Sequence, residues 1–481
     1  MLFNSLSFAF FLPLVFILYW FVCRKNLRYQ NILLVVASYF FYACWDWRFL
    51  FLLVFSTVLD YFSGVKMAEA NNQRVKNFWF WFSISVNLGF LGFFKYYNFF
   101  ITEFAEAIAN LGFQVNPWTL EVILPVGISF YTFHGLSYVI DIYKDRIKVE
   151  RNFIDYSLFV SFFPLLVAGP IERATHLLPQ IKKKRIFDFT NAADGMRQIL
   201  WGLFKKIVIA DKCAEYANEI FNNSGDYSGS TLLLGAVYFA FQIYGDFSGY
   251  SDIAIGTAKL FGIDLLRNFS FPYFSRDIAE FWRRWHISLS SWFRDYLYIP
   301  LGGSQGGIWM KIRNTFIIFL VSGFWHGANW TFIIWGLLNA LYIMPSIIFN
   351  TNRSNLDIVA QGRYWPTFKE FFQVTLTFCL TVLAWIFFRA NDLTHALRYV
   401  SDLFSWSLFA LPTKMPANSN TFIMLAFFLI IEWLGREQPF ALARIGLKWK
   451  RPIRWAFYYI IIAIIFYCVD SKEQQFIYFQ F

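Results

Sequence analysis

Two histidines are the residues of this sequence best suited to chemistry. His286 lies in FWRRWHISLSSWFRDYLYIPLGGS (Phe281–Ser304), and His326 lies in SGFWHGANW (Ser322–Trp330). An ionisable side chain in apolar surroundings is costly, and for that reason it marks a candidate functional site. Neutral imidazole accepts a proton or donates a hydrogen bond near pH 7. The two histidines therefore predict general acid–base chemistry.

The residues around His286 follow a helical period. At 100° per residue one face carries His286 with Trp282, Trp285, Leu289, Trp292, Phe293 and Tyr296. Three arginines fall on the opposite side, at Arg283, Arg284 and Arg294. The pattern predicts one amphipathic helix with an aromatic face, lying at or dipping below a membrane interface. Burial on that face favours the neutral imidazole. The alternative is an interfacial anchor whose histidine bonds a backbone carbonyl.

His326 follows an uninterrupted apolar segment, Thr315–Val321. Small residues surround it, at Ser322, Gly323, Gly327 and Ala328. Such residues let a neighbouring helix or a ligand approach closely. Taken alone, the pattern also fits a buried histidine that only packs, so both interpretations stay open at this point.

The composition places these histidines in a membrane protein. Of 481 residues, 58% are hydrophobic and only 15% are charged, against about 25% charged in an ordinary soluble domain. Continuous apolar segments predict an all-α polytopic membrane protein that forms a single domain over residues 1–481. The net charge of +11 comes from basic residues in short loops, a topology signal that argues against nucleic-acid binding. Five cysteines without C-x-x-C spacing predict neither a disulfide framework nor a metal site.

The apolar segments predict about eleven membrane-spanning helices, with further re-entrant or interfacial helices. The positions of Lys and Arg place both termini outside the cytoplasm. The segment Ala192–Ala210 carries too many basic residues for a lipid-facing span. Asp246 and Asp252, in YGDFSGYSD, belong to a span and should face protein or water. Two interpretations are open for them: they cap broken helices or pair with nearby arginines, or they line a substrate path.

Five co-linear motifs resemble one known family. PVGISFYTFHGLSYVID, FFPLLVAGPIER, QIYGDFSGYSDIAIG, FWRRWHISLSSWFRDYLYIPLGG and SGFWHGANW together look like the membrane-bound O-acyltransferase (MBOAT) family. They are most similar to its bacterial alginate O-acetylation (AlgI-like) branch. The resemblance covers nearly the whole chain and is strongest from residue 125 to residue 340. It implies a helical funnel in which His326 is the essential histidine and His286 the second family histidine.

The resemblance also implies a reaction. Acetyl groups would pass from a cytoplasmic thioester, acetyl-CoA, across the inner membrane to an extracytoplasmic polysaccharide. Transfer to a hydroxyl needs a base, which would be His326. An exported SGNH- or alginate-type acetyltransferase would be the protein partner, and no bound cofactor is expected. The alternatives are D-alanyl transfer from a carrier protein to teichoic acid (DltB-like), or a polysaccharide or lipid transporter without chemistry.

Further residues acquire candidate roles from this resemblance. Arg283, Arg284 and Arg294 would hold phosphates of coenzyme A or contact lipid headgroups. The predicted tunnel-lining residues are Trp285, Trp325, Asp246 and Asp252. The extracytoplasmic tail, residues 470–481, ends in FIYFQF. It either rests at the interface as an aromatic belt or folds back into the funnel, where Tyr478 would act as an acyl relay.

Overall fold

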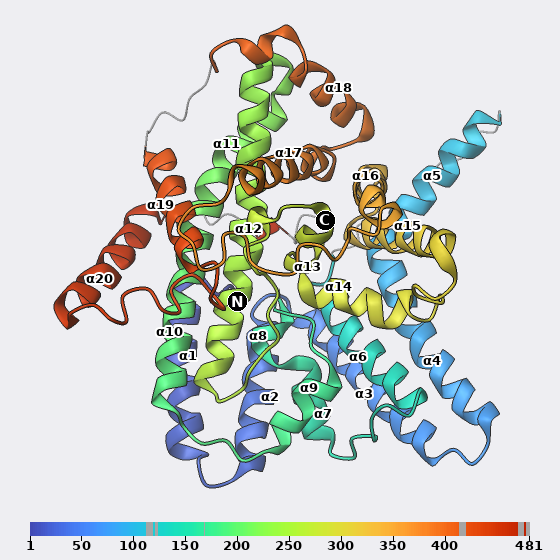
Figure 1. Ribbon diagram of the computed structural model, residues 1–481. Helices are drawn as coiled ribbons and strands as arrows, with labels where there is room; N and C mark the ends of the chain where they lie inside the picture. Colours follow the sequence, from blue (N-terminus) through green and yellow to red (C-terminus); the bar gives the residue numbers. More distant parts are fainter. Residues whose placement is uncertain (112–118, 121–123, 168, 413–419, 470–475, 478–481) are drawn as a thin grey trace. The chain divides into compact units, whose positions relative to one another are not determined.

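The computed structural model describes residues 1–111, 119–120, 124–167, 169–412, 420–469 and 476–477. Within these residues every regular element is a helix, which confirms the predicted all-α class (Figure 1). The chain divides into two compact units, and the single membrane domain over residues 1–481 stays a prediction. Unit 1 comprises Met1–Met196 and Ala254–Leu266, and unit 2 comprises Arg197–Ile253 and Arg267–Phe481.

Unit 1 holds the first half of the helices. They are α1 (Leu6–Ile17), η1 (Leu18–Val22), α2 (Leu27–Ala43), α3 (Trp47–Glu69), α4 (Gln73–Leu91), η2 (Gly92–Tyr96), α5 (Tyr97–Asn110), α6 (Ile128–Tyr143), α7 (Phe153–Ser161), α8 (Phe163–Leu166) and α9 (Ala174–Lys182). Two longer helices have residues in both units, α10 (Phe189–Leu203) and α12 (Gly229–Leu260).

Unit 2 holds the other elements. They are η3 (Phe204–Ala210), α11 (Asp211–Asn222), η4 (Ser224–Asp226), η5 (Pro272–Phe274), α13 (Ile278–Arg284), α14 (Ile287–Phe293), η6 (Arg294–Tyr298), α15 (Gly307–His326), α16 (Trp330–Ile348), α17 (Phe368–Arg389), α18 (Leu393–Leu403), η7 (Trp406–Phe409), α19 (Asn420–Gly435) and α20 (Arg451–Cys468). Both predicted histidines belong to this unit.

Five helical segments of the described chain are long and apolar enough to cross a membrane. They are Trp47–Glu69, Gln73–Ala109, Trp330–Ile348, Phe368–Arg389 and Arg451–Cys468. Two shorter apolar helices are Leu6–Val22 and Asn420–Gly435. The chain is therefore a multi-pass membrane protein, while the number eleven stays a prediction.

In unit 1, α3, α4 and α6 pack around a buried carboxyl group. Asp60 accepts hydrogen bonds at Oδ1 from Ser83 Oγ (2.6 Å) and Asn87 Nδ2 (2.7 Å). Gly135 of α6 lies so close that a Cβ there would be 2.0 Å from Asp60 Oδ2. A polar group buried in lipid or protein must be hydrogen-bonded inside the molecule. The carboxyl group thus ties α3 to α4, and the missing side chain of Gly135 lets α6 pack against it.

The AGPIER motif of unit 1 has a structural role. Glu172 is fully buried, and its carboxylate accepts hydrogen bonds from the Leu266 amide (2.6 Å) and His176 Nδ1 (2.8 Å). The Glu172 amide donates to His134 Nε2 (3.1 Å). The non-helical turn before α9 is therefore held by side chains that replace the missing helical hydrogen bonds.

In unit 2, glycines bring main chains into contact at two places. On α12, Gly245 and Gly249 leave room for η3 and the end of α10, since a Cβ at Gly245 would lie 2.9 Å from the Lys205 carbonyl oxygen and one at Gly249 would lie 2.8 Å from the Gly202 carbonyl oxygen. Helices α15 and α16 pack side by side (Figure 1). There a Cβ at Gly323 would lie 2.3 Å from the Phe332 carbonyl oxygen. The small residues near His326 thus admit a neighbouring helix, one of the two predicted possibilities.

Candidate active site

The helix predicted around His286 is broken at the histidine itself. Trp285 ends α13 in an extended conformation, and His286 adopts φ 43°, in the left-handed region that non-glycine residues rarely occupy. The peptide groups on both sides bond to a neighbouring loop instead of continuing a helix. Ser270 N–H donates to the Arg284 carbonyl and Ile287 N–H donates to the Asn268 carbonyl, both at 2.9 Å. The prediction of one continuous amphipathic helix is therefore wrong.

The same loop fixes the imidazole ring of His286. Asn268 donates through Nδ2 to Ser251 Oγ (3.1 Å), which directs its Oδ1 toward His286. That oxygen accepts from His286 Nδ1 at 3.0 Å and from Ser288 Oγ at 2.9 Å. Since an amide oxygen only accepts, the ring proton must be on Nδ1. The lone pair of the neutral imidazole is therefore on Nε2.

His286 is placed to use that lone pair. The residue is 1% exposed, and among the described residues no group hydrogen-bonds to its Nε2. Burial lowers the pKa of His286 to about 3, so the ring is neutral at physiological pH. A buried nitrogen without a protein partner is costly unless a substrate or water uses it. The arrangement is that of a base or of a hydrogen-bond acceptor for a substrate group.

His326 lies at the C-terminal end of α15, in an aromatic enclosure close to His286. Its ring centroid is 4.7 Å from that of Trp325, 5.1 Å from Trp335 and 5.2 Å from Phe388. Trp325 is also a neighbour of His286, at 6.3 Å between centroids. The structure thus brings together the two histidines that the sequence singled out, with one indole ring in common.

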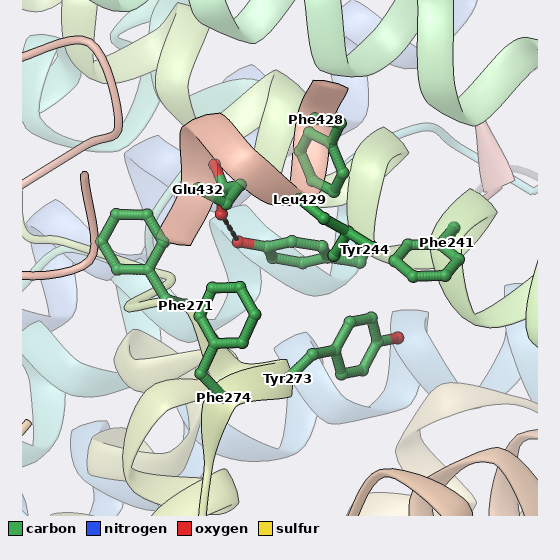
Figure 2. A pocket seen from close by; sticks show the side chains of 8 residues that line it. All are labelled: Phe241, Tyr244, Phe271, Tyr273, Phe274, Phe428, Leu429 and Glu432. Atoms are coloured by element: carbon green, nitrogen blue, oxygen red, sulfur yellow. Dashed lines mark hydrogen bonds between the residues drawn. The ribbon is translucent and has the colours of Figure 1, made fainter. Parts of the chain in front are cut away.

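Trp285 connects this enclosure to a small aromatic pocket. Its ring lies 5.1 Å from Trp385 and 6.1 Å from Tyr244. Figure 2 shows the pocket, in which aromatic rings from α12, the loop around η5 and α19 face one another. Glu432 of α19 accepts hydrogen bonds there from Tyr244 Oη (2.6 Å) and Trp201 Nε1 (2.8 Å). This carboxylate was not predicted from the sequence, because the apolar segment around it indicates only a span.

The three arginines proposed for the donor have different surroundings. Arg283 donates to the carbonyls of Asn352 and Asn355, both at 2.7 Å. Arg284 is buried and bonds Glu280 Oε1 at 2.7 Å. Arg294 is exposed, as Arg283 is, and it forms an ion pair of 2.8 Å with the adjacent Asp295. Arg283 and Arg284 therefore hold parts of unit 2 in place, and a role in donor binding stays a prediction for all three.

Asp246 and Asp252 of α12 form ion pairs with consecutive lysines of η3. Asp246 Oδ1 lies 2.9 Å from Lys206 Nζ, and Asp252 Oδ2 lies 2.6 Å from Lys205 Nζ. Two of the basic residues that made Ala192–Ala210 unsuitable as a lipid-facing span thus pair with aspartates. Pairing was one of the two predicted interpretations, although with lysines in place of arginines. A role in lining a substrate path stays a prediction.

The end of the described chain lies in the same unit. Phe476 and Ile477 are 0% and 1% exposed. The Phe476 ring lies 4.4 Å from Tyr250 and 6.2 Å from Phe247, and Phe247 in turn lies 4.6 Å from His286. Tyr478, the predicted acyl relay, lies outside the described residues.

Comparison with known proteins relates this arrangement to a family. Residues 143–387 match MBOAT, the membrane-bound O-acyltransferase family. The probable alginate O-acetylase AlgI of Pseudomonas aeruginosa is 38% identical over 89% of this chain and 81% of its own. The peptidoglycan O-acetyltransferase of Helicobacter pylori is 38% identical over 84% and 80%. The teichoic acid D-alanyltransferase of Streptococcus thermophilus is 29% identical over 50% and 62%. The chain therefore belongs to the membrane-bound O-acyltransferase family and is an O-acyltransferase.

Proposed function

We propose that this enzyme moves acetyl groups from a cytoplasmic thioester, acetyl-CoA, to an extracytoplasmic polysaccharide. The observation that carries the proposal is the pair of imidazoles next to Trp325, one of them with its tautomer fixed by Asn268. Relatives named as O-acetylases align over most of this chain, whereas the named D-alanyltransferase aligns over half of it. Acetyl transfer is therefore preferred to D-alanyl transfer.

In the proposed step a hydroxyl oxygen attacks the thioester carbonyl, and His326 takes the hydroxyl proton. The new C–O bond forms as the C–S bond breaks, and the proton passes to the thiolate, which leaves as a thiol. His286 offers the lone pair on Nε2 to a hydrogen-bond donor of either substrate, which orients that substrate. Neutral imidazoles suit both roles.

Tyr478 is the proposed first acceptor. Its phenol would receive the acetyl group as an ester, and the exported SGNH- or alginate-type partner would then move it to the sugar hydroxyl and restore the phenol. Support comes from the two preceding residues, which are both buried, and from the Phe476 ring, which lies 6.2 Å from Phe247, a neighbour of His286. The proposal includes the inner membrane as location, with both termini on the outer side, and Arg294 as a phosphate ligand for the donor.

The test is acyl transfer by the purified protein in lipid vesicles, measured as thiol release from acetyl-CoA. His326→Ala is expected to abolish transfer in a folded protein, and His286→Ala to lower it by less. Tyr478→Phe removes only the hydroxyl group, and it should abolish polymer acetylation at normal expression. Transfer that survives His326→Ala would exclude that residue as the base. Polymer acetylation at the parent rate in Tyr478→Phe would exclude the relay.

A further inference from the structure

A buried carboxylate on α12 holds the main chain of the C-terminal segment. Asp246 is 2% exposed, and it uses its two oxygens for different partners. Oδ1 lies 2.9 Å from Lys206 Nζ, and Oδ2 accepts a hydrogen bond of 2.7 Å from the Ile477 amide. A carboxylate bonded to an amide at that distance forms a strong, charge-assisted hydrogen bond.

The surroundings of Asp246 fit a built receptor. Lys206 is 1% exposed and also pairs with Asp211, at 2.8 Å, so its position is fixed from two sides. The Lys206 ammonium lies 5.8 Å from the centre of the Tyr250 ring, and that ring contacts Phe476. Charge and aromatic surface thus converge on the same two residues of the tail.

A purely structural ion pair does not account for this arrangement. Asp252, on the same helix, pairs with Lys205 at 2.6 Å and with Gln198 Nε2 at 2.8 Å, so its partners all belong to α10 and η3. Asp246 instead directs one oxygen to a segment that follows the last helix, α20. Phe476 and Ile477 are both buried, so the segment that receives this hydrogen bond is packed and not left in solvent.

We propose that Asp246, held by Lys206, is a positioning residue that seats the C-terminal segment beside Phe247 and His286. The seat recognises the Ile477 main-chain amide and the Phe476 ring. It therefore holds the two residues that precede Tyr478, the proposed acceptor. This inference rests on the proposed relay for its catalytic meaning, but the seat itself is measurable without any acyl donor.

The experiment is hydrogen–deuterium exchange of the full-length protein in detergent, resolved to the Ile477 amide by overlapping peptides. The comparison is between the parent, Asp246→Asn and Asp252→Asn. In Asp246→Asn the side-chain oxygen turns to the Lys206 ammonium, which leaves an N–H group facing the Ile477 N–H. Loss of a hydrogen bond to a charged group predicts exchange about 10- to 100-fold faster. Asp252→Asn breaks a comparable lysine pair and should leave Ile477 protected.

A second variant separates seating from folding. Asp246→Asn combined with Lys206→Met leaves no unpaired ammonium in the core, and it should still expose the Ile477 amide. Equal protection of Ile477 in the parent and in both Asp246 variants would overturn the seat. Equal loss of protection in Asp252→Asn would also overturn it, because the effect would then be general loosening. If Ile477 behaves as expected while Tyr478→Phe acetylates polymer normally, the seat stands and the relay fails.

Discussion

Replacement of Asn268 tests whether the orientation of His286 matters for the reaction. Asn268→Leu keeps the side-chain size but removes the acceptor for His286 Nδ1 and Ser288 Oγ and the donor to Ser251 Oγ. All three of these partners are at most 2% exposed. Loss of the acceptor leaves the buried Nδ1–H group unsatisfied, which costs about 1–3 kcal/mol. Acyl transfer is therefore expected to fall by about 10- to 100-fold.

Asn268→Asp is the matched variant, because a carboxylate still accepts from Nδ1 and should retain more of the rate. Its charge raises the pKa of His286, so the rate of this variant should fall more steeply toward low pH than the rate of the parent. The assay is thiol release in vesicles from pH 5 to pH 8, with a double-mutant cycle against His286→Ala. If Asn268 acts through the ring, Asn268→Leu adds little loss to His286→Ala. Fully additive losses would refute the reasoning.

Three further predictions concern stability in detergent, measured by thermal unfolding. Gly323→Ala should destabilise the fold by about 1–3 kcal/mol, because its Cβ would lie 2.3 Å from a carbonyl oxygen. Gly89→Ala is the control, since a Cβ there meets open space and should not destabilise the fold. Lys205→Met removes the cation that pairs with the half-buried Asp252 carboxylate and should cost about 3 kcal/mol, most of it recovered when Asp252→Leu is added; no recovery would contradict pairing. The pKa of His286 is about 3 in the folded protein and about 6.5 in the unfolded chain, so the parent loses free energy of unfolding as pH falls through that interval. The difference in free energy of unfolding between the parent and His286→Gln should therefore shrink from pH 7 to pH 4.5. A constant difference would contradict this prediction.

The sequence predicts the class of this fold and the two histidines, because both signals are local. Apolar segments indicate spans wherever they pack, and a histidine among tryptophans is unusual in any apolar segment. The break at Trp285–His286 was missed because a helical period cannot show a competing loop. That loop comes from residues 268–270, whose amide and carbonyl groups replace the helical hydrogen bonds.

The sequence pattern also could not predict which charged residues form ion pairs across segments far apart in the chain. The basic residues of Ala192–Ala210 and the acidic residues of YGDFSGYSD both stand out in the sequence. Neither segment alone indicates which lysine forms an ion pair with which aspartate. The one indication of this pairing in the sequence is steric, namely the two glycines beside Asp246. Gly245 and Gly249 flank Asp246 at a spacing that lets η3 approach α12, and that approach sets Lys206 against Asp246. Nothing in the sequence indicates that Asn268 orients His286, because a single asparagine in a loop is common.

The aromatic enclosure of His326 has a consequence for the fate of the acyl group. The rings of Trp325, Trp335 and Phe388 surround an imidazole that is 5% exposed. A base that activates a hydroxyl group activates water equally well, so an open site would hydrolyse the thioester. Closed, apolar walls keep water scarce where the reactive carbonyl must lie. In the proposed reaction the enclosure would thereby favour transfer over hydrolysis, which gives its tryptophans a role beyond packing.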